Sequence, residues 1–460
     1  MKNRFAYLTI VLGFAAVLLP AGKAQAIPAF ARLYKTECNT CHTIFPDRKP
    51  FGDAFRKNSY VWPGKLPEQM EEEIQYAPRQ EAAFQGMSSA GRKKPRAGNW
   101  LTAIPDQVPI SLWVNHDIVF DKNAKRVTAD AATGQSATVP ATQFDLDGLT
   151  ELEMFTGGSF RGKAGWWAEY NFAPDHDIGE IFVQLRHLLG SPVNLKIGRF
   201  KPRLSLWKSN DSATISSYGY NDMVVGVNTT TAVPTSGNPF TIDTEKGGVE
   251  LNSLVGNRLF LATGVMTPPE KNRNGVDYYG HASVRFGGAD FAGNDPEISL
   301  TRESIWENLA LTFGSFVYVG SSLNEKLDTT TNTFLKFKNN FYRVAVEAEI
   351  LYKNLRFRMN GIHGEDKNPQ GPDGLGISER SRFYMAQGQY IFMRNLLAAM
   401  RYEYQDIEHE GTTRRYIPTI VYAPWQNVRM TLEYNHEIKP HVINLENINR
   451  VYTCRFTFAF

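Results

Sequence analysis

The sequence predicts an all-β protein, a transmembrane antiparallel β-barrel of about 16 strands. Three observations carry this prediction. Charged and apolar residues alternate along short segments, tight turns alternate with long polar connections, and the chain ends in an aromatic strand. After the N-terminal region, no stretch approaches the roughly 20 apolar residues that a spanning helix needs. Any passage through a membrane is therefore expected to use strands.

Residues 1–26 have the pattern of a secretory signal peptide. Lys2 and Arg4 precede an apolar run that ends at Pro20, and Ala24-Gln25-Ala26 offers small residues at the cleavage positions. The mature chain is expected to begin at the next residue, outside the cytoplasm. Cleavage removes three basic residues and no acidic one, which turns 50 basic against 47 acidic residues into 47 of each. A neutral chain gives no reason to expect nucleic acid as a partner.

Cys38, Cys41 and His42 form the sequence Cys-x-x-Cys-His, in a chain with three cysteines in all. This is the attachment signature of c-type haem, in which two thiols bond to the haem vinyl groups and the histidine ligates the iron. A disulfide in a small loop and a thioredoxin-like redox pair are the alternatives, although the redox pair belongs to a βαβ setting that this segment lacks. The motif predicts one covalent haem c, with His42 as metal ligand.

The segment around the motif is too short to enclose a haem by itself. Fewer than 40 residues separate Ile27 from Gly64, near the length below which a chain cannot build its own core. Its aromatic residues either pack on the macrocycle or form a small core of their own; they are Phe45, Phe51, Phe55, Tyr60 and Trp62. The remaining chain is expected to cover the other face of the haem.

Strict alternation supports the strands of the barrel. Residues 341–350 place charged side chains on one face and apolar ones on the other, and the same period of two recurs in residues 354–360 and 428–435. The expected lumen charges are Arg343, Glu347, Arg356, Arg358, Arg429 and Glu433. A soluble sandwich also alternates, so the lengths of the connections are the stronger observation.

The connections are short and long in turn. Tight turns are expected at residues 256–257, 353–354, 394–395 and 425–427, and long polar connections near residues 121–145, 202–242, 321–339, 364–380 and 437–449. Short turns at one end and long loops at the other are typical of outer-membrane barrels. Residues 288–307 form a long connection where a short turn is due, which leaves room for an overlooked pair of strands.

The chain end, "VYTCRFTFAF", has an aromatic face and a polar face that carries Thr453, Arg455 and Thr457. Its terminal Phe460 resembles the C-terminal signal of outer-membrane barrels. Cys454 falls on the apolar face and is interpreted as a lipid-facing residue rather than a functional thiol.

An even number of strands places both ends of the barrel in the periplasm, where the haem segment would enter the lumen. The predicted domains are a signal peptide (1–26), a haem c segment with its linker (27–100) that plugs the lumen, and an outer-membrane β-barrel (101–460). A redox centre within an apolar band about 25 Å tall would let electrons cross it.

The run "PAFARLYKTECNTCHTIFPDRKPFGDAFRKNSY", between a signal peptide and a barrel, resembles the fused monohaem c-type cytochrome–porin family of bacterial outer membranes. The best-known members of that family oxidise ferrous iron at the cell surface. The resemblance implies an electron path from an extracellular donor to a periplasmic c-type cytochrome, with Cys38 and Cys41 as thioether anchors and His42 as proximal ligand. Over the barrel the likeness is only architectural, and relatives with unknown donors share it.

The sixth ligand of the iron stays open. Met70 and Met87 are near in sequence, and a methionine ligand would raise the reduction potential. The histidines of the barrel region are further candidates: His116, His176, His187, His281, His363, His409, His436 and His441. An open sixth position is the remaining alternative.

Ferrous iron would need ligands at the extracellular mouth. Three expected extracellular connections combine histidine with acidic residues, at 175–177, 363–366 and 408–410. Carboxylate and imidazole ligands suit divalent iron, although solvated loops often have this composition too.

Two functions of different class follow. The first is an outer-membrane electron conduit that passes electrons from extracellular ferrous iron or another donor to a periplasmic c-type cytochrome, with iron(II):cytochrome oxidoreductase as the corresponding enzyme class. The second is a solute porin whose haem segment is a plug, gate or sensor. A haem peroxidase or reductase has less support, because no acid–base constellation accompanies the motif. The sequence leaves the direction of electron flow open.

Overall fold

The computed structural model describes residues 30, 38–62, 110–122, 125–129, 136–140, 143–160, 163–173, 176–207, 212–222, 242, 245–267, 275–293, 306–328, 331–369, 378–408, 411–439 and 447–459. The helices are α3 (Cys38–Cys41), α4 (Pro50–Lys57), η1 (Leu188–Gly190) and η3 (Gly219–Asp222). The strands are β1 (Ile110–Asp121), β2 (Lys125–Ala129), β3 (Ser136–Pro140), β4 (Gln143–Phe160), β5 (Ala164–Ala173), β6 (Asp177–Leu185), β7 (Val193–Phe200), β8 (Lys246–Val255), β9 (Leu259–Met266), β10 (Asp277–Phe286), β11 (Trp306–Asp328), β12 (Thr333–Lys353), β13 (Leu355–Asp366), β14 (Glu379–Met393), β15 (Leu396–Ile407), β16 (Gly411–Trp425), β17 (Val428–Lys439) and β18 (Asn447–Ala459). None of the helices within these ranges has the length and apolar composition of a membrane-spanning helix.

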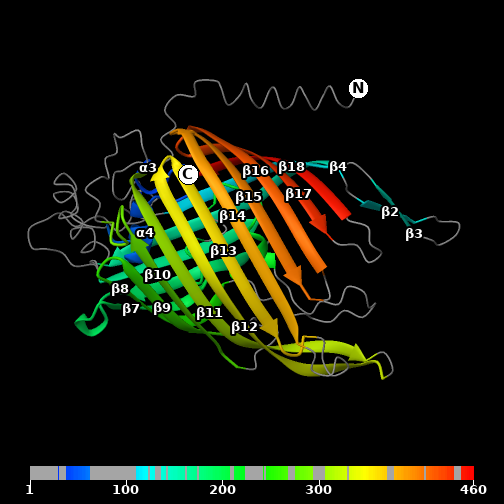
Figure 1. Ribbon diagram of the computed structural model, residues 1–460, viewed down its shortest axis with the longest axis horizontal. Helices are drawn as coiled ribbons and strands as arrows, with labels where there is room; N and C mark the ends of the chain where they lie inside the picture. Colours follow the sequence, from blue (N-terminus) through cyan, green and yellow to red (C-terminus); the bar gives the residue numbers. More distant parts are fainter. Residues whose placement is uncertain are drawn as a thin grey trace, which may run out of the picture.

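Sixteen antiparallel strands of the described chain close into one barrel (Figure 1). β1 pairs with β4 on one side and with β18 on the other, so the first and last strands of the barrel seal it. Each remaining barrel strand pairs with its neighbours in sequence. β2 and β3 form a separate hairpin within the connection from β1 to β4. The prediction of an all-β antiparallel barrel of about 16 strands is confirmed.

The burial of side chains is the reverse of that in a soluble protein. Charged residues assigned to the lumen are buried, with Arg343 0% and Glu433 5% exposed. Apolar residues of the other face are open to the surroundings, with 67% of Val346 and 42% of Leu432 exposed. Soluble domains bury apolar residues and seldom bury charges fully, whereas a barrel in lipid needs an apolar outer band. The alternation therefore belongs to a membrane-type barrel with a polar lumen.

The predicted tight turns are confirmed, and they share one end of the barrel. β8 and β9 meet through Gly256 and Asn257, whose φ angles of 56° and 59° suit a type I′ hairpin turn. Residues 354, 394–395 and 426–427 separate the strands of the other three predicted hairpins. Both β1 and β18 also reach this end, because Trp113 pairs with Ala459.

The prediction of a long polar connection at residues 321–339 is wrong. β11 and β12 stay paired from Trp306↔Lys353 to Asp328↔Thr333, so these residues lengthen a hairpin that projects beyond its neighbours (Figure 1). The stretch is rich in Asn, Lys and Thr and lacks an apolar face. A strand of this composition shows no alternation of polar and apolar residues and cannot be recognised by it. The overlooked strand pair that residues 288–307 left room for does not exist in the barrel, because β10 pairs directly with β11.

β18 has the two faces that the sequence predicts. Arg455 lies on the inner face and donates two hydrogen bonds of 2.7 Å to Asp117 of β1. Cys454 pairs with Ile118 and Leu432 of the adjacent strands, on the outer face of the barrel. The lipid-facing interpretation of this cysteine agrees with its position.

Two parts of the chain lie within the lumen. One is residues 38–62, the N-terminal segment, whose helices α3 and α4 are seen in blue at the barrel end where the C-terminus lies (Figure 1). The other is residues 201–207 and 212–222 of the β7–β8 connection, the inner loop. Both contribute to one buried cluster with inward-facing barrel residues, including Tyr60 of the N-terminal segment, Trp207 of the inner loop and Phe383 of β14.

Lumen carboxylates hold the inner loop in place. Glu433 of β17 accepts hydrogen bonds of 2.7 Å from the amides of Ile215 and Ser216. Glu347 of β12 accepts one of 2.8 Å from the amide of Leu206. These bonds satisfy loop amides that burial would otherwise leave without partners. The sequence predicts residues 202–242 as an extracellular connection, but the described part of it folds into the lumen.

Candidate functional site

The Cys-x-x-Cys-His motif occupies a single helical turn. α3 spans Cys38–Cys41, and the amide of His42 donates a hydrogen bond of 2.9 Å to the carbonyl of Cys38. Residues three and four positions apart lie on the same face of a helix, so Cys41 and His42 both neighbour Cys38 on that face. The spacing thus gathers two thiols and one imidazole at one place.

The loop after the motif fixes the imidazole of His42. Nδ1 of His42 lies 3.0 Å from the carbonyl oxygen of Pro46. Because a carbonyl only accepts hydrogen bonds, Nδ1 carries the proton, and the neutral ring then has its lone pair on Nε2. Metal-ligating histidines are commonly oriented in this way by a backbone carbonyl on the second ring nitrogen. The loop itself is closed by the amide of Thr43, which donates a hydrogen bond of 2.8 Å to the carbonyl of Asp47.

The surroundings of Cys41 do not favour its thiolate form. No disulfide joins them in this structure. Burial, together with the charge of Cys38, raises the pKa of the Cys41 thiol to about 12. Reactive cysteines of Cys-x-x-Cys oxidoreductases have a lowered pKa, because the thiolate is the nucleophile. The raised pKa of Cys41 does not favour a thioredoxin-like pair, which stays an alternative together with the small-loop disulfide.

Gly52 lets α4 pack tightly on the motif. A Cβ atom at this position would lie 2.3 Å from the carbonyl oxygen of Cys41, which is closer than any real contact. α4 begins at Pro50, whose ring suits the first turn of a helix. Glycine at the third position of α4 is therefore required for the close packing of α4 against α3.

We expect Gly52→Ala to push α4 away from the motif and to destabilise the N-terminal segment by about 1–3 kcal/mol, the usual cost of overpacking. Hydrogen exchange of the amides of residues 42–58 would measure this as faster exchange. Gly280→Ala on β10 is the matched control, because its Cβ would have a nearest neighbour at 3.8 Å. Equal exchange in the two variants would contradict the packing role of Gly52.

Asp47 is the main anchor of the N-terminal segment in the barrel. Its carboxylate is 0% exposed and forms ion pairs with Arg356 and, at 3.1 Å, with Arg358 of β13. Both arginines also approach the carboxylate of Glu349, at 3.5 and 3.2 Å. Two guanidinium groups thus share two carboxylates within the lumen, and one of the four groups comes from the loop that holds His42.

Further barrel residues form hydrogen bonds to this loop and to the motif before it. Arg429 of β17 donates a hydrogen bond of 2.9 Å to the carbonyl of Phe45. The side-chain oxygen of Gln426, in the tight turn between β16 and β17, accepts a hydrogen bond of 2.9 Å from the amide of Cys38. The motif therefore lies at the tight-turn end of the barrel. Three of the charges that the alternation assigned to the lumen, Arg356, Arg358 and Arg429, contact this loop.

α4 and its C-terminal turn contact the opposite wall. Arg186 donates a hydrogen bond of 2.6 Å to the side chain of Asn58. A Cβ on Gly165 of β5 would lie 2.0 Å from the carbonyl oxygen of Ser59, so the two backbones touch. Lys57 and Asp53 form a half-buried i,i+4 ion pair. Burial lowers the pKa of Lys57 to about 8. Burial alone would raise the pKa of Asp53, but Lys57 and the nearby arginines hold it well below its usual range.

The aromatic residues around the motif divide into two groups. Phe45 lies beside the imidazole of His42, with 5.0 Å between ring centroids, and contacts Trp113 of β1 at 4.7 Å. The others pack among themselves or on the barrel wall: Phe51 on Trp62, and Phe55 and Tyr60 within the buried lumen cluster. Most of these aromatic residues therefore form a small core, as one of the two interpretations expects. Phe45 differs, because its ring contacts the motif.

These residues fit a haem c. The donor set is two thiols and an imidazole on one turn, and the hydrogen bond to Pro46 orients the imidazole as an iron ligand. The assignment of Cys38, Cys41 and His42 remains a prediction, since the fit concerns their chemistry and arrangement. Met70, Met87, His409 and His441 lie outside the described residues, so two of the barrel histidines and both methionines are not placed.

Of the described barrel histidines, His281 of β10 alone is buried. It faces the lumen, with 6% of its surface exposed. His436 lies on the other face of its strand, within hydrogen-bond distance of Tyr434 at 3.2 Å. His116, His176, His187 and His363 are partly or fully exposed.

The expected iron ligands at residues 363–366 are not brought together. Asp366 points into the lumen and pairs with Arg343 at 2.7 Å, whereas His363 and Glu365 lie on the other face of β13. Neighbouring positions of a strand point to opposite faces, so the acids adjacent in sequence separate. Within the described ranges, no group of three or more His, Cys, Asp or Glu side chains is arranged to hold a metal ion. Asp175, His409 and Glu410 of the other two clusters lie outside them.

Sequence reasoning did not find Asp47 or the inner loop. Asp47 sits in a polar run, "PDRKP", that reads as a solvated turn. One signal in the sequence could have pointed to it. Arg356 and Arg358 occupy successive inward positions of the same strand, and two buried arginines need a carboxylate from another part of the chain.

Comparisons with known proteins concern the barrel. No family model and no curated protein matches the chain. Among solved structures, the chain is similar to the anion-selective porin from Comamonas acidovorans, with 12% identity, a TM-score of 0.50, and coverage of 77% of this chain and 99% of the porin. Pseudomonas putida OprB (6% identity, TM-score 0.49, coverage 79% and 97%) and the outer membrane channel DcaP of Acinetobacter baumannii (12%, 0.47, 77% and 97%) are also similar.

The similarity to the Comamonas acidovorans porin establishes a shared fold. At 12% identity it carries no information on what passes through the lumen. The chain therefore has a porin-like barrel of sixteen antiparallel strands, of the kind found in outer membranes.

Proposed function

We propose that this protein is an outer-membrane electron conduit that carries a single c-type haem within its barrel. The observation that carries the proposal is the placement of His42: its Nδ1 proton is held by Pro46, and the adjacent Asp47 is fixed to the lumen wall by Arg356 and Arg358. A Cys-x-x-Cys-His motif built for solvent exposure would not need a buried ion pair to the barrel. In this proposal the motif is seated inside the membrane protein.

Each residue of the site has a defined part in the proposal. Cys38 and Cys41 are the thioether anchors, and His42 is the proximal ligand. When bound, haem c supplies an iron centre that accepts and donates one electron. The Pro46 carbonyl keeps His42 in one tautomer and orientation. The ion pairs of Asp47 and the hydrogen bond of Arg429 to Phe45 keep the motif loop fixed to the barrel.

The barrel geometry supports contact between the motif and a periplasmic partner. Tight turns of outer-membrane barrels lie on the periplasmic side, and the motif lies at that end through the contact of Cys38 with Gln426. A periplasmic c-type cytochrome would approach this end. Extracellular ferrous iron is the donor that the sequence resemblance favours, and the protein would then be an iron(II):cytochrome oxidoreductase.

A solute porin with a haem-bearing plug is the second candidate. The observation that favours it is the porin-like fold, which the chain shares with an anion-selective porin. Two inserted segments, residues 38–62 and the inner loop, lie in the lumen of this barrel, and movement of either segment would change the space open to solutes. In this alternative the haem would report or control that movement.

Reduction kinetics separate the two candidates. In sealed vesicles with the long loops outward, we expect a membrane-impermeant reductant or ferrous iron, added anaerobically outside, to reduce the haem, as seen in its visible absorption bands. A Cys38→Ser/Cys41→Ser variant is the control and should lack these bands. Solute flux that depends on the redox state of the haem would instead favour the gated porin. Absence of covalent haem from the purified protein would contradict both.

A further inference from the structure

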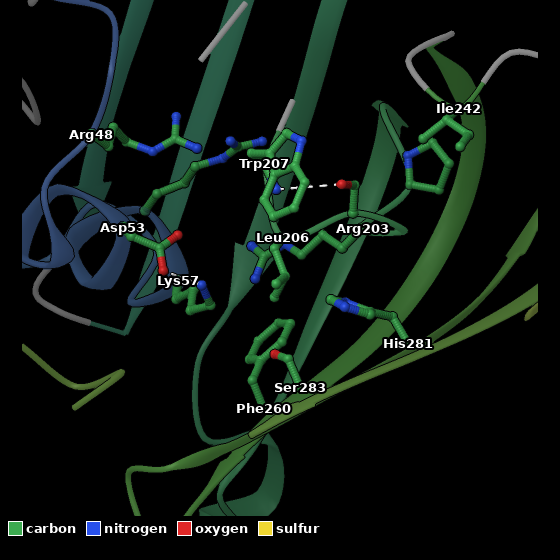
Figure 2. A pocket seen from close by; sticks show the side chains of 13 residues that line it. Arg48, Asp53, Lys57, Arg203, Leu206, Trp207, Ile242, Phe260, His281 and Ser283 are labelled. Atoms are coloured by element: carbon green, nitrogen blue, oxygen red, sulfur yellow. Dashed lines mark hydrogen bonds and ion pairs between the residues drawn. The ribbon is translucent and has the colours of Figure 1, made fainter. Parts of the chain in front are cut away.

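A donor-rich cavity in the lumen lies beside α4, away from the Cys-x-x-Cys-His motif. Figure 2 shows its walls: Asp53 and Lys57 of α4 on one side, Arg203 and Trp207 of the inner loop above, and Phe260 and His281 of β9 and β10 opposite. Neither motif cysteine nor His42 lines it. Three separate parts of the fold meet here, so the cavity exists only because the N-terminal segment and the inner loop are both inserted.

The lining of the cavity carries an excess of positive charge. Arg48, Arg56, Lys57 and Arg203 line it, with Asp53 as the carboxylate. Asp53 is already paired with Lys57. Lys57 and Arg203 both also lie over the ring of Phe260, at 5.3 and 5.4 Å from its centroid. Charges interact strongly where water is excluded, so this arrangement attracts an anion.

Arg203 presents an unused donor to the cavity. Its Nε lies 3.4 Å from the carboxylate of Glu250, and its Nη2 donates a hydrogen bond of 3.0 Å to Gln184. Its Nη1 is buried and has no hydrogen-bond partner among the described residues. Two of the three nitrogens therefore fix the guanidinium group, and the third is available to a ligand.

β10 adds two more polar groups without partners. His281 and Ser283 are two positions apart and so share the inner face of the strand. They are 6% and 2% exposed, and within the described chain neither ring nitrogen of His281 nor Oγ of Ser283 has a hydrogen-bond partner. The carboxylate of Glu347 is 3.9 Å from Nε2 of His281, too far for a hydrogen bond. Buried polar groups in native proteins are nearly always satisfied by protein, water or a ligand, so these groups leave room for a partner in the cavity.

The space between the lining side chains is small, which suits a small ligand. It has about 40 Å³ of space for the centres of water-sized atoms. One such atom needs roughly 10–15 Å³, so the space holds about three. A carboxylate or a nitrate ion has two or three oxygen atoms in one plane and matches this volume, whereas a macrocycle does not.

We propose that this cavity is a binding site for a planar oxyanion of the size of a carboxylate, held by Arg203, His281 and Ser283. Two sources offer this chemistry: a free small anion, or a propionate group of the haem. The site itself follows from the cavity and its donors, and only the second source rests on the proposed function. In either case the anion would join the inner loop to β10.

Equilibrium dialysis with radiolabelled formate tests the site. The purified full-length protein and its Cys38→Ser/Cys41→Ser variant would be compared, each alone and with Ser283→Ala or His281→Phe added. We expect saturable binding of one formate in at least one of the two backgrounds. Each lining substitution should weaken it about tenfold or more, because a hydrogen bond to a charged group is lost.

Binding in both backgrounds would identify a free anion as the occupant. Binding only in the cysteine variant would identify a haem carboxylate as the occupant of the native site. Ser381→Ala on β14 is the matched control: this serine is equally buried with an unpartnered Oγ but does not line the cavity. No binding in either background, or equal binding after Ser283→Ala and Ser381→Ala, would overturn the proposal. If only the haem assignment were wrong, the wild type and the Cys38→Ser/Cys41→Ser variant would bind formate equally.

Discussion

Asp47→Ala is expected to release residues 38–62 from the barrel. The substitution leaves Arg356 and Arg358 buried with Glu349 alone, and loss of one partner of a buried ion pair costs about 3–5 kcal/mol. The amides of His42 and Thr43, which are protected inside the motif loop, should then exchange with solvent at least a hundredfold faster. Hydrogen exchange read by mass spectrometry in detergent or lipid measures this directly.

Two further variants define the cause of that release. Asp47→Asn keeps an acceptor oxygen and removes the charge, so its exchange should lie between those of the wild type and the alanine variant. Asp177→Ala, at an exposed position of β6, should exchange as the wild type does. Unchanged protection of Thr43 in Asp47→Ala would mean that the apolar contacts of Phe55 and Tyr60 suffice to hold the segment, and that the ion pair is not its anchor.

His42→Ala is expected to leave the haem attached but to alter its electronic state. In the proposed conduit Cys38 and Cys41 would make the two thioether bonds, so covalent haem should persist on denaturing gels. Loss of the axial ligand should change the visible spectrum and shift the reduction potential by on the order of 100 mV or more, because axial ligands set haem potentials over about 0.8 V. Anaerobic redox titration with optical detection gives both quantities.

A control separates ligation from general disturbance of the barrel. His436→Ala removes an imidazole from the outer face of β17, beside Tyr434, and should leave both spectrum and potential unchanged. If His42→Ala had the spectrum and potential of the wild type, the proximal ligand would lie elsewhere. His281, the buried lumen histidine among those described, would then be the next residue to replace.

The inner loop changes the role of the acidic residues that face the lumen. In an empty lumen, Glu433 and Glu347 would be charged groups of a water-filled channel. Here they accept hydrogen bonds from backbone amides of Ile215, Ser216 and Leu206. The same acidic residues therefore stabilise a filled barrel. This filling of the lumen is common to both proposed functions, the electron conduit and the porin with a haem-bearing plug.

The strands were predictable because their signal is local. A membrane barrel must alternate polar and apolar side chains. The neighbouring residues Arg343 and Val344 therefore show which face of the strand is polar and which is apolar. Tight turns are local as well, as with Gly256 and Asn257. The extended β11–β12 hairpin escaped prediction because outside the membrane both faces of a strand meet water, and the alternation disappears.

By itself the sequence determined the barrel, its tight-turn end and the motif of Cys38, Cys41 and His42, since each depends on residues close together in the chain. Only the tertiary structure decided that Asp47 meets Arg356 and Arg358, more than 300 positions away, and that the inner loop turns inward. It also decided that Arg203, His281 and Ser283 face one cavity. The physical reason is that buried charges and donors are satisfied by whatever group the closed barrel brings near them, and neither spacing nor periodicity encodes that pairing.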